Sequence, residues 1–70
     1  MDYKVTKSLM ESLKPGGRIK VFRCSSVSDF QSQLRMAYYV RQNYPRQDGG
    51  RYIISSSGVG MTISIRVEKD

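Results

Sequence analysis

The strongest constraint in this sequence is a stretch from Ser26 to Tyr44 that has the pattern of one amphipathic helix. Ser26 and Asp29 stand at the spacing of a capping box, and Asp29 adds a negative charge to the first turn, where the helix dipole favours it. Pro45 disfavours helical geometry at Tyr44, so the helix should end there. The apolar stripe that the fold must cover comprises Val27, Phe30, Leu34, Ala37 and Tyr38.

A shorter helix and a strand are predicted before this long helix. Residues 3–13 carry apolar side chains at helical spacing, and Thr6 or Ser8 could cap the helix. Residues 14–17, which include a proline and two glycines, should end it. Residues 18–24 alternate charged with bulky side chains, which predicts a short strand.

The C-terminal part of the chain predicts a β-hairpin. After a loop over residues 45–50, residues 51–57 and 61–67 have strand patterns. Gly58 and Gly60 fall in the turn between them and are free to take positive φ. The last strand alternates strictly between apolar and polar residues, as in a sheet with one buried and one wet face.

These elements predict an α+β fold: a short N-terminal helix, then β-α-β-β, with the long helix packed on a three-stranded sheet. We expect the third strand in the middle, antiparallel to both others, and a right-handed crossover through the long helix. The simple order one-two-three is the alternative. The expected core consists of Ile19, Val21, Phe30, Leu34, Ala37, Tyr38, Ile54, Ile63 and Ile65.

The chain has 70 residues, enough for one domain, 1–70, with a thin core. Domains of this size often gain stability from a disulfide, a metal or a partner chain. Cys24 is the only cysteine and there is no histidine, which leaves self-association, as in a homodimer, as the remaining candidate. The sequence shows no membrane span and no signal-peptide pattern, and a single free thiol fits the cytoplasm.

The net charge of +6 is concentrated in the middle of the chain. Residues 14–66 carry nine Lys and Arg against two Asp, a net charge of +7, whereas both ends are close to neutral. Most of these cations are arginines, which grip phosphate in a bidentate manner and stack on aromatic rings. A cationic ordered region is typical of nucleic-acid binding, although the charge could also serve solubility alone.

Nothing in the sequence predicts an enzyme, and no cofactor is expected. Cys24 lacks a histidine base and is interpreted as structural. Asp29 and Asp48 are explained as a helix cap and a turn residue. The segment 55–60 superficially resembles a phosphate-binding loop, but it joins two strands instead of opening a helix.

Two surfaces are candidates for binding. Around the end of the long helix, tyrosines alternate with arginines that could contact bases and phosphates. The second candidate is the sheet face opposite the long helix, where Lys20 and Arg66 would point together with hydroxyl side chains. The rival arrangement has the short helix covering this face, anchored by Phe22 and Ile53. The predicted nucleic-acid-binding residues are Lys20, Arg35, Tyr39, Arg41, Arg46, Arg51 and Arg66.

Four short segments give the chain a resemblance to small basic proteins encoded by bacteriophages and mobile elements. They are Leu13-Lys14-Pro15-Gly16, the helix from Ser26 to Ala37, Gly50-Arg51-Tyr52, and Arg66. The resemblance implies a DNA-associated context and transfers no catalytic residue. It favours DNA over RNA as the partner.

The sequence therefore predicts a small basic module that binds nucleic acid mainly through phosphate contacts. The alternative is a protein-interaction module that uses an apolar patch on the helices, with no nucleic acid involved. Attachment to anionic lipid is a weaker third interpretation, because no helix pairs a broad apolar face with a basic one. The patch of the alternative comprises Leu9, Met36, Tyr39 and Val40.

Overall fold

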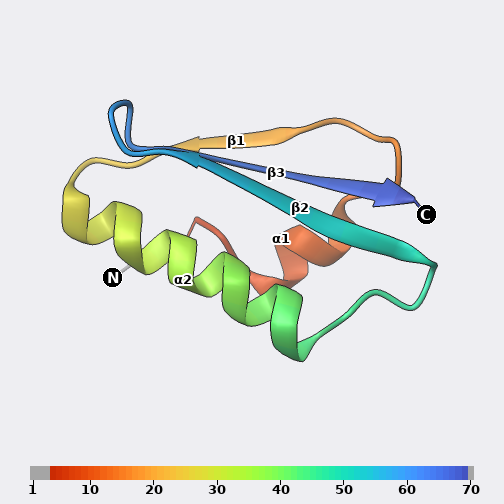
Figure 1. The fold of residues 1–70 in the computed structure, drawn as a ribbon. Helices are drawn as coiled ribbons and strands as arrows, with labels where there is room; N and C mark the ends of the chain where they lie inside the picture. The colour runs from red at the N-terminus through yellow and green to blue at the C-terminus, as the bar shows by residue number, and fades with distance from the viewer. Residues whose placement is uncertain (1–3, 70) are drawn as a thin grey trace.

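The computed structural model describes residues 4–69 and has two layers (Figure 1). Both helices lie on one side of a three-stranded sheet, and no helix within residues 4–69 covers the other side (Figure 1). This arrangement confirms the predicted α+β class. The elements are α1 (Lys7–Ser12), β1 (Lys20–Arg23), α2 (Val27–Asn43), β2 (Gly50–Ser57) and β3 (Thr62–Lys69).

The sheet has the strand order β1-β3-β2, with β3 antiparallel to both neighbours. The prediction that the third strand lies in the middle is confirmed, and the alternative order one-two-three is wrong. Ile65 of β3 faces Lys20 of β1 and Ile54 of β2. Since β1 and β2 run parallel with β3 between them, α2 is the connection that crosses from one edge of the sheet to the other.

The helix α2 begins and ends almost where the sequence predicts. The Ser26 hydroxyl accepts a hydrogen bond from the Asp29 N–H at 3.1 Å, which is the capping contact. The Asp29 carboxylate reaches back to the Ser25 N–H at 3.2 Å, one residue earlier than in a standard capping box. At the other end, the Tyr44 N–H donates to the Val40 carbonyl, immediately before Pro45.

The N-terminal segment packs against α2 and not against the opposite side of the sheet. α1 is shorter than predicted, with Thr6 as its N-cap, and Val5 is buried just before it. Gln33 of α2 is fully buried, and its Oε1 accepts hydrogen bonds from the N–H groups of Lys4 and Val5 at 2.9 and 3.0 Å. The rival arrangement, in which the short helix covers the other sheet face, is therefore wrong.

The strand β1 faces the opposite way from the predicted core. Phe22 and Cys24 point towards the helices and are buried, whereas Ile19 and Val21 are 55% and 58% exposed. Phe22 lies opposite the buried Ile63, so the register places its ring in the core. Both faces of this strand carry apolar side chains, and burial of the aromatic ring removes the larger area from water.

The buried stripe of α2 is also rotated from its predicted position. Gln33, Ala37 and Val40 are fully buried, whereas Tyr38, which was expected in the core, is 40% exposed. The segment around Val5 and α1 packs on the side of α2 that includes Gln33, which draws the buried stripe away from Tyr38. Phe30, Leu34 and Ile54 are partly buried against the core, and Ala37, Ile63 and Ile65 are fully buried, as predicted.

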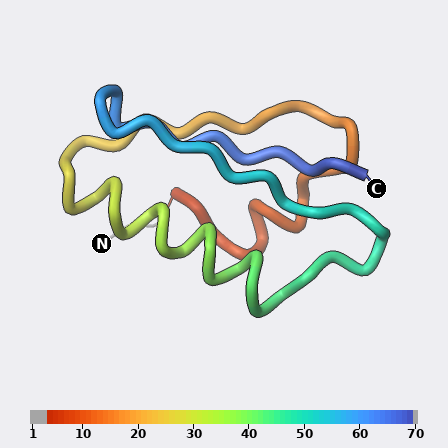
Figure 2. The backbone as a smooth tube through the Cα atoms, in the orientation of Figure 1, coloured from red at the N-terminus to blue at the C-terminus, as the bar shows by residue number. Residues whose placement is uncertain are grey.

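The predicted β-hairpin is confirmed, with a four-residue turn between Ser57 and Thr62. Positive φ falls on Met61, at 49°, and not on the two glycines of this turn. The Met61 carbonyl accepts a hydrogen bond from the Cys24 N–H at 2.8 Å, so the turn is tied to the segment that leads into α2 (Figure 2). This contact extends the pairing of β1 and β3 beyond the last residue of β1.

Candidate functional site

Three of the predicted cations line one groove at the outer edge of β2. Arg41 comes from the last turn of α2, Arg46 from the following loop and Arg51 from β2. We call this hollow of about 330 Å³ the β2-edge groove. Its remaining lining consists of Pro45, Gly50, Tyr52 and Ile53. Arginines from a helix, a loop and a strand thus lie around one hollow on the surface.

Arg41 and Arg51 present their guanidinium groups to solvent. The Arg41 guanidinium stacks over the Tyr38 ring, with its central carbon 4.7 Å from the ring centroid. Stacking on a ring leaves the N–H groups at the rim of the guanidinium available to another acceptor. The Arg51 side chain is 63% exposed and lies 3.6 Å from the Glu68 carboxylate. An exposed ion pair of this kind contributes little to stability, so a phosphate can compete with it.

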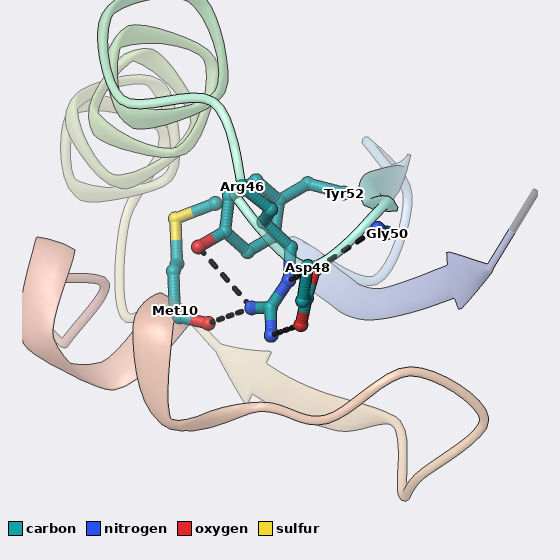
Figure 3. Close-up of polar contacts among 5 residues, drawn as sticks. All are labelled: Met10, Arg46, Asp48, Gly50 and Tyr52. Atoms are coloured by element: carbon teal, nitrogen blue, oxygen red, sulfur yellow. Dashed lines mark hydrogen bonds and ion pairs between the residues drawn. The ribbon is translucent and has the colours of Figure 1, made fainter.

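Arg46 is held inside a network of hydrogen bonds beneath the groove (Figure 3). It donates to both carboxylate oxygens of Asp48, at 2.7 and 3.1 Å, and to the Met10 carbonyl at 3.3 Å. It also donates to the Tyr52 hydroxyl at 3.4 Å, and Asp48 in turn accepts the Gly50 N–H at 2.9 Å. The network joins α1, the loop and the start of β2.

The same network shifts two pKa values. Hydrogen bonds from Arg46 and then from the Gly50 N–H lower the pKa of Asp48 to about 2. The hydrogen bond with Asp48 raises the pKa of Arg46. The Arg46 side chain is only 10% exposed, so its role is mainly structural: it forms part of the groove wall and connects the loop to α1. We therefore do not count Arg46 among the ligand-binding groups, although the sequence predicted it there.

The uncovered side of the sheet continues from the groove, and we call it the free face. Residues that lie directly opposite each other in an antiparallel pair project on the same side of the sheet. Arg66 lies opposite Ile53, and Arg51 lies opposite Glu68. The residues of the free face that matter below are Val21, Arg23, Arg51, Ser55, Ser64 and Arg66.

Glu68 is the acidic group within this cationic surface. It accepts a hydrogen bond from the Arg66 guanidinium at 2.8 Å and pairs with Arg51 on its other side. The hydrogen bond and the charge of Arg66 lower the pKa of Glu68, and the charge of Arg51 lowers it further. One carboxylate between two arginines leaves a positive balance, to which Arg23 adds at the far edge of the free face.

Lys20 does not lie on the free face, and this prediction is wrong. It is opposite the buried Ile65, so it points to the same side of the sheet as the helices. It stays exposed because β1 is an edge strand. Arg23 takes the expected place of Lys20 on the free face, because it lies opposite Thr62 of β3. The ambiguous alternation of β1 concealed which of these two cations faces outwards.

Arg35 and Tyr39 belong to a separate surface on α2. They line a shallow hollow of about 210 Å³ with Ser32 and Met36. Six residues separate Arg35 from Arg41, which places the two side chains roughly 120° apart around the helix. The seven predicted residues therefore do not form one site, and the groove and the free face contain three of them with accessible guanidiniums: Arg41, Arg51 and Arg66.

The aromatic contacts of Tyr39 occupy the end of α2. Its ring meets that of Tyr44 edge to face, with centroids 6.0 Å apart, and Lys7 of α1 lies 4.8 Å from the Tyr44 ring centroid. The hydrogen bond with Tyr44 raises the pKa of Tyr39. These rings join the two helices, and this surface has few free cations around it.

The protein-interaction patch of the alternative interpretation does not form. Val40 is fully buried, and Leu9 and Met36 pack partly buried against the core. Of the four residues in that patch, Tyr39 alone is well exposed, at 53%. The helices thus offer no broad apolar contact surface of that composition.

The described residues contain no cluster of side chains with the composition of a metal site. Between residues 4 and 69, no three Cys, Asp or Glu side chains gather as metal ligands would. Cys24 is buried, and burial raises the pKa of its thiol, which disfavours the reactive thiolate. Among the same residues, no helix is long and apolar enough to cross a membrane.

Comparison with protein-family models, curated proteins and solved structures finds no match to this chain. The resemblance to small phage and mobile-element proteins therefore stays a prediction from the sequence.

Proposed function

We propose that this protein binds nucleic acid, with DNA preferred over RNA, through the β2-edge groove and the adjoining free face. One observation carries the proposal: Arg41 of α2 and Arg51 of β2 line the same groove, and Arg66 follows on the free face. Arginines at neighbouring positions can neutralise successive phosphates, and release of counterions then drives the binding.

The surroundings of these arginines support phosphate contact. Ser55 and Ser64 place hydroxyl groups next to the arginines on the free face, and hydroxyls donate readily to phosphate oxygens. Glu68 opposes the binding only weakly, because its ion pairs with Arg51 and Arg66 are both solvent-exposed and can be exchanged for contacts with phosphate. The affinity would come mainly from backbone contacts.

A titration across a salt series tests the proposal. Neutralising about three or four phosphates of a duplex with the accessible arginines of this surface predicts a slope of about −3 in a plot of log affinity against log salt. Arg41→Gln combined with Arg51→Gln removes two contacts, so the slope should become shallower by about 1.8 and the affinity at 0.1 M salt should fall roughly 50-fold. No binding at 50 mM salt would overturn the proposal.

A charge-matched variant separates the site from general charge. Lys7→Gln combined with Arg35→Gln also removes two positive charges, but from the helical layer. This variant should keep most of the affinity and the slope. Equal losses in both double variants would show that only net charge matters and would remove the groove from the proposal. Far-UV circular dichroism checks that both variants fold.

A further inference from the structure

The free face carries one arginine on each outer strand, the ion pair of Arg66 and Glu68 on the central strand, and one row of small side chains. Arg23 lies on β1 and Arg51 on β2, the two outer strands of the sheet. Between them, the cross-strand row through Ser64 of β3 consists of Val21, Ser64 and Ser55. The face is therefore shallow along this row, which lies between the levels of Arg23 and Arg51 along the strands.

The spacing of the two outer strands is comparable to the width of one groove of duplex DNA. Neighbouring strands lie about 4.8 Å apart, so the outer strands of this sheet are separated by roughly 10 Å. The major groove of B-form DNA is about 12 Å wide. Arginines on the outer strands would then stand next to the two phosphate backbones that border the groove, and Arg41 would extend the margin beyond Arg51.

Proteins that hold single-stranded nucleic acid usually stack its bases on aromatic side chains, and the described part of the free face offers none. Tyr38 and Tyr39 lie on α2, Tyr44 caps that helix, and Tyr52 and Phe22 point into the core. Among residues 4–69, the free face thus carries no aromatic ring. Arginine, serine and aliphatic side chains suit two ordered backbones and the base edges between them.

We propose that the ligand is B-form duplex DNA and that the free face enters its major groove, with the strands running along the groove. This inference rests on the proposed function and specifies its substrate class. Arg23 and Arg51 contact opposite phosphate backbones, while Ser64 and Arg66 of the central strand face the base edges. Double-stranded RNA is excluded because the major groove of an A-form helix is too deep and narrow for side chains to read.

Competition between matched nucleic acids tests the substrate class. A 20-base-pair DNA duplex, each of its single strands and the RNA duplex of the same sequence are titrated against the labelled DNA duplex at 0.1 M salt. The DNA duplex should bind at least 10-fold tighter than the other three. Tighter or equal binding of a single strand or of RNA would overturn this inference and leave the proposed function standing. No binding of any of them would overturn both.

Two substitutions with equal charge test the contact surface. Ser55→Glu places a carboxylate on the free face beside Ser64 of the central strand, and Ser28→Glu places one in the first turn of α2. Both serines are exposed, so neither change disturbs the core. Ser55→Glu should weaken duplex binding at least 10-fold more than Ser28→Glu. Equal effects would show that the free face does not contact the DNA.

Groove-specific competitors identify which groove is occupied. Methyl green, which binds the major groove, should displace the protein from the duplex, and the minor-groove binder netropsin should displace it far less. Displacement by netropsin alone would place the protein in the minor groove and overturn the inference, while the proposed function would again remain.

Discussion

Gln33 is the one polar side chain that is fully buried among the described residues. Its Oε1 accepts the N–H groups of Lys4 and Val5, and its Nε2 donates to the Asp29 carboxylate at 3.2 Å. The amide therefore attaches the N-terminal segment to α2 and steadies the residue that caps the helix. A sequence pattern cannot identify this role, because the partners of Gln33 include backbone groups 28 and 29 residues away.

Replacing Gln33 with leucine should destabilise the protein strongly. Each buried N–H left without an acceptor costs about 1–3 kcal/mol, so we expect the free energy of unfolding to fall by roughly 2–4 kcal/mol. Urea denaturation followed by circular dichroism measures the loss. Gln31→Leu is the matched control, because Gln31 is exposed on the same helix, and its effect should stay within about 0.5 kcal/mol. Equal effects would contradict the role of Gln33.

Arg46 shows why part of the site could not be predicted. Its position in a turn-rich loop, between tyrosines and other arginines, is typical of a binding residue. The acceptors that occupy it are the neighbouring Asp48 and the Met10 carbonyl, which is 36 residues away in sequence. Only the packing of α1 against this loop reveals that the guanidinium connects parts of the fold.

The ion pair between Arg46 and Asp48 should make stability depend on acidity. The folded-state pKa of Asp48 is about 2, below its ordinary value of 3.8, so the pair stabilises the folded state above about pH 4. This contribution is lost as the pH falls from about 4 to about 2. Asp48→Asn should be less stable than the natural protein at pH 7, and the difference should shrink over that window. Urea midpoints at a series of pH values measure it, and a constant difference would contradict the assignment.

At the scale of elements, the buried face of a strand could be predicted where apolar and polar residues alternate strictly, and not where both faces carry apolar residues. β3 alternates between apolar and polar residues, so Ile63, Ile65 and Val67 are buried as a set. β1 carries apolar side chains on both faces, and tertiary packing alone decides that Phe22 turns inwards and Val21 outwards. Because the sequence does not decide which face of β1 points inwards, Lys20 was wrongly predicted on the free face, where the structure has Arg23.

The start of β2 requires a glycine at position 50, because the neighbouring residues leave no room for a side chain. A Cβ atom on Gly50 would lie 2.8 Å from Val67 Cγ1, 3.0 Å from Asp48 Oδ1 and 3.2 Å from Pro15 Cγ. The close approach lets the loop, the segment after α1 and the end of β3 meet at one point. It also places Asp48 where it can accept the Gly50 N–H.

Gly50→Ala should therefore destabilise the junction. Overpacking of this kind costs about 1–3 kcal/mol, and we expect a lower thermal midpoint with weaker protection of the β2 amides from hydrogen exchange. Gly58→Ala is the control, because a Cβ there meets nothing within 4 Å and its φ is not positive. That variant should be neutral or more stable by about 0.4–1 kcal/mol. A neutral Gly50→Ala would show that Val67 and Pro15 can move aside.

At the scale of the whole molecule, two features combine: helices on a single side of the sheet and an excess of positive charge. A sheet covered on one side buries few residues, and a small core supplies only about 3–5 kcal/mol. Mutual repulsion of the cations reduces this further at low salt. A polyanion that binds the folded state but not the unfolded state would therefore raise the free energy of unfolding by a large fraction. Self-association would have the same effect, because a partner chain also binds the folded state.

This coupling predicts a strong thermal shift with duplex DNA. At a free ligand concentration of 100 times Kd, binding adds about 2.7 kcal/mol of stability. For a domain of this size, that increment raises the thermal midpoint by on the order of 10 °C or more. The shift, followed by circular dichroism at a wavelength where DNA contributes little, should shrink as salt rises, because each phosphate contact is weakened by competing cations. In the Arg41→Gln, Arg51→Gln variant it should be much smaller, while the Lys7→Gln, Arg35→Gln variant should retain it. A thermal midpoint that is unaffected by DNA at low salt would contradict the coupling of fold and ligand. A midpoint that rises with protein concentration in the absence of DNA would instead identify a second copy of the chain as the stabilising partner.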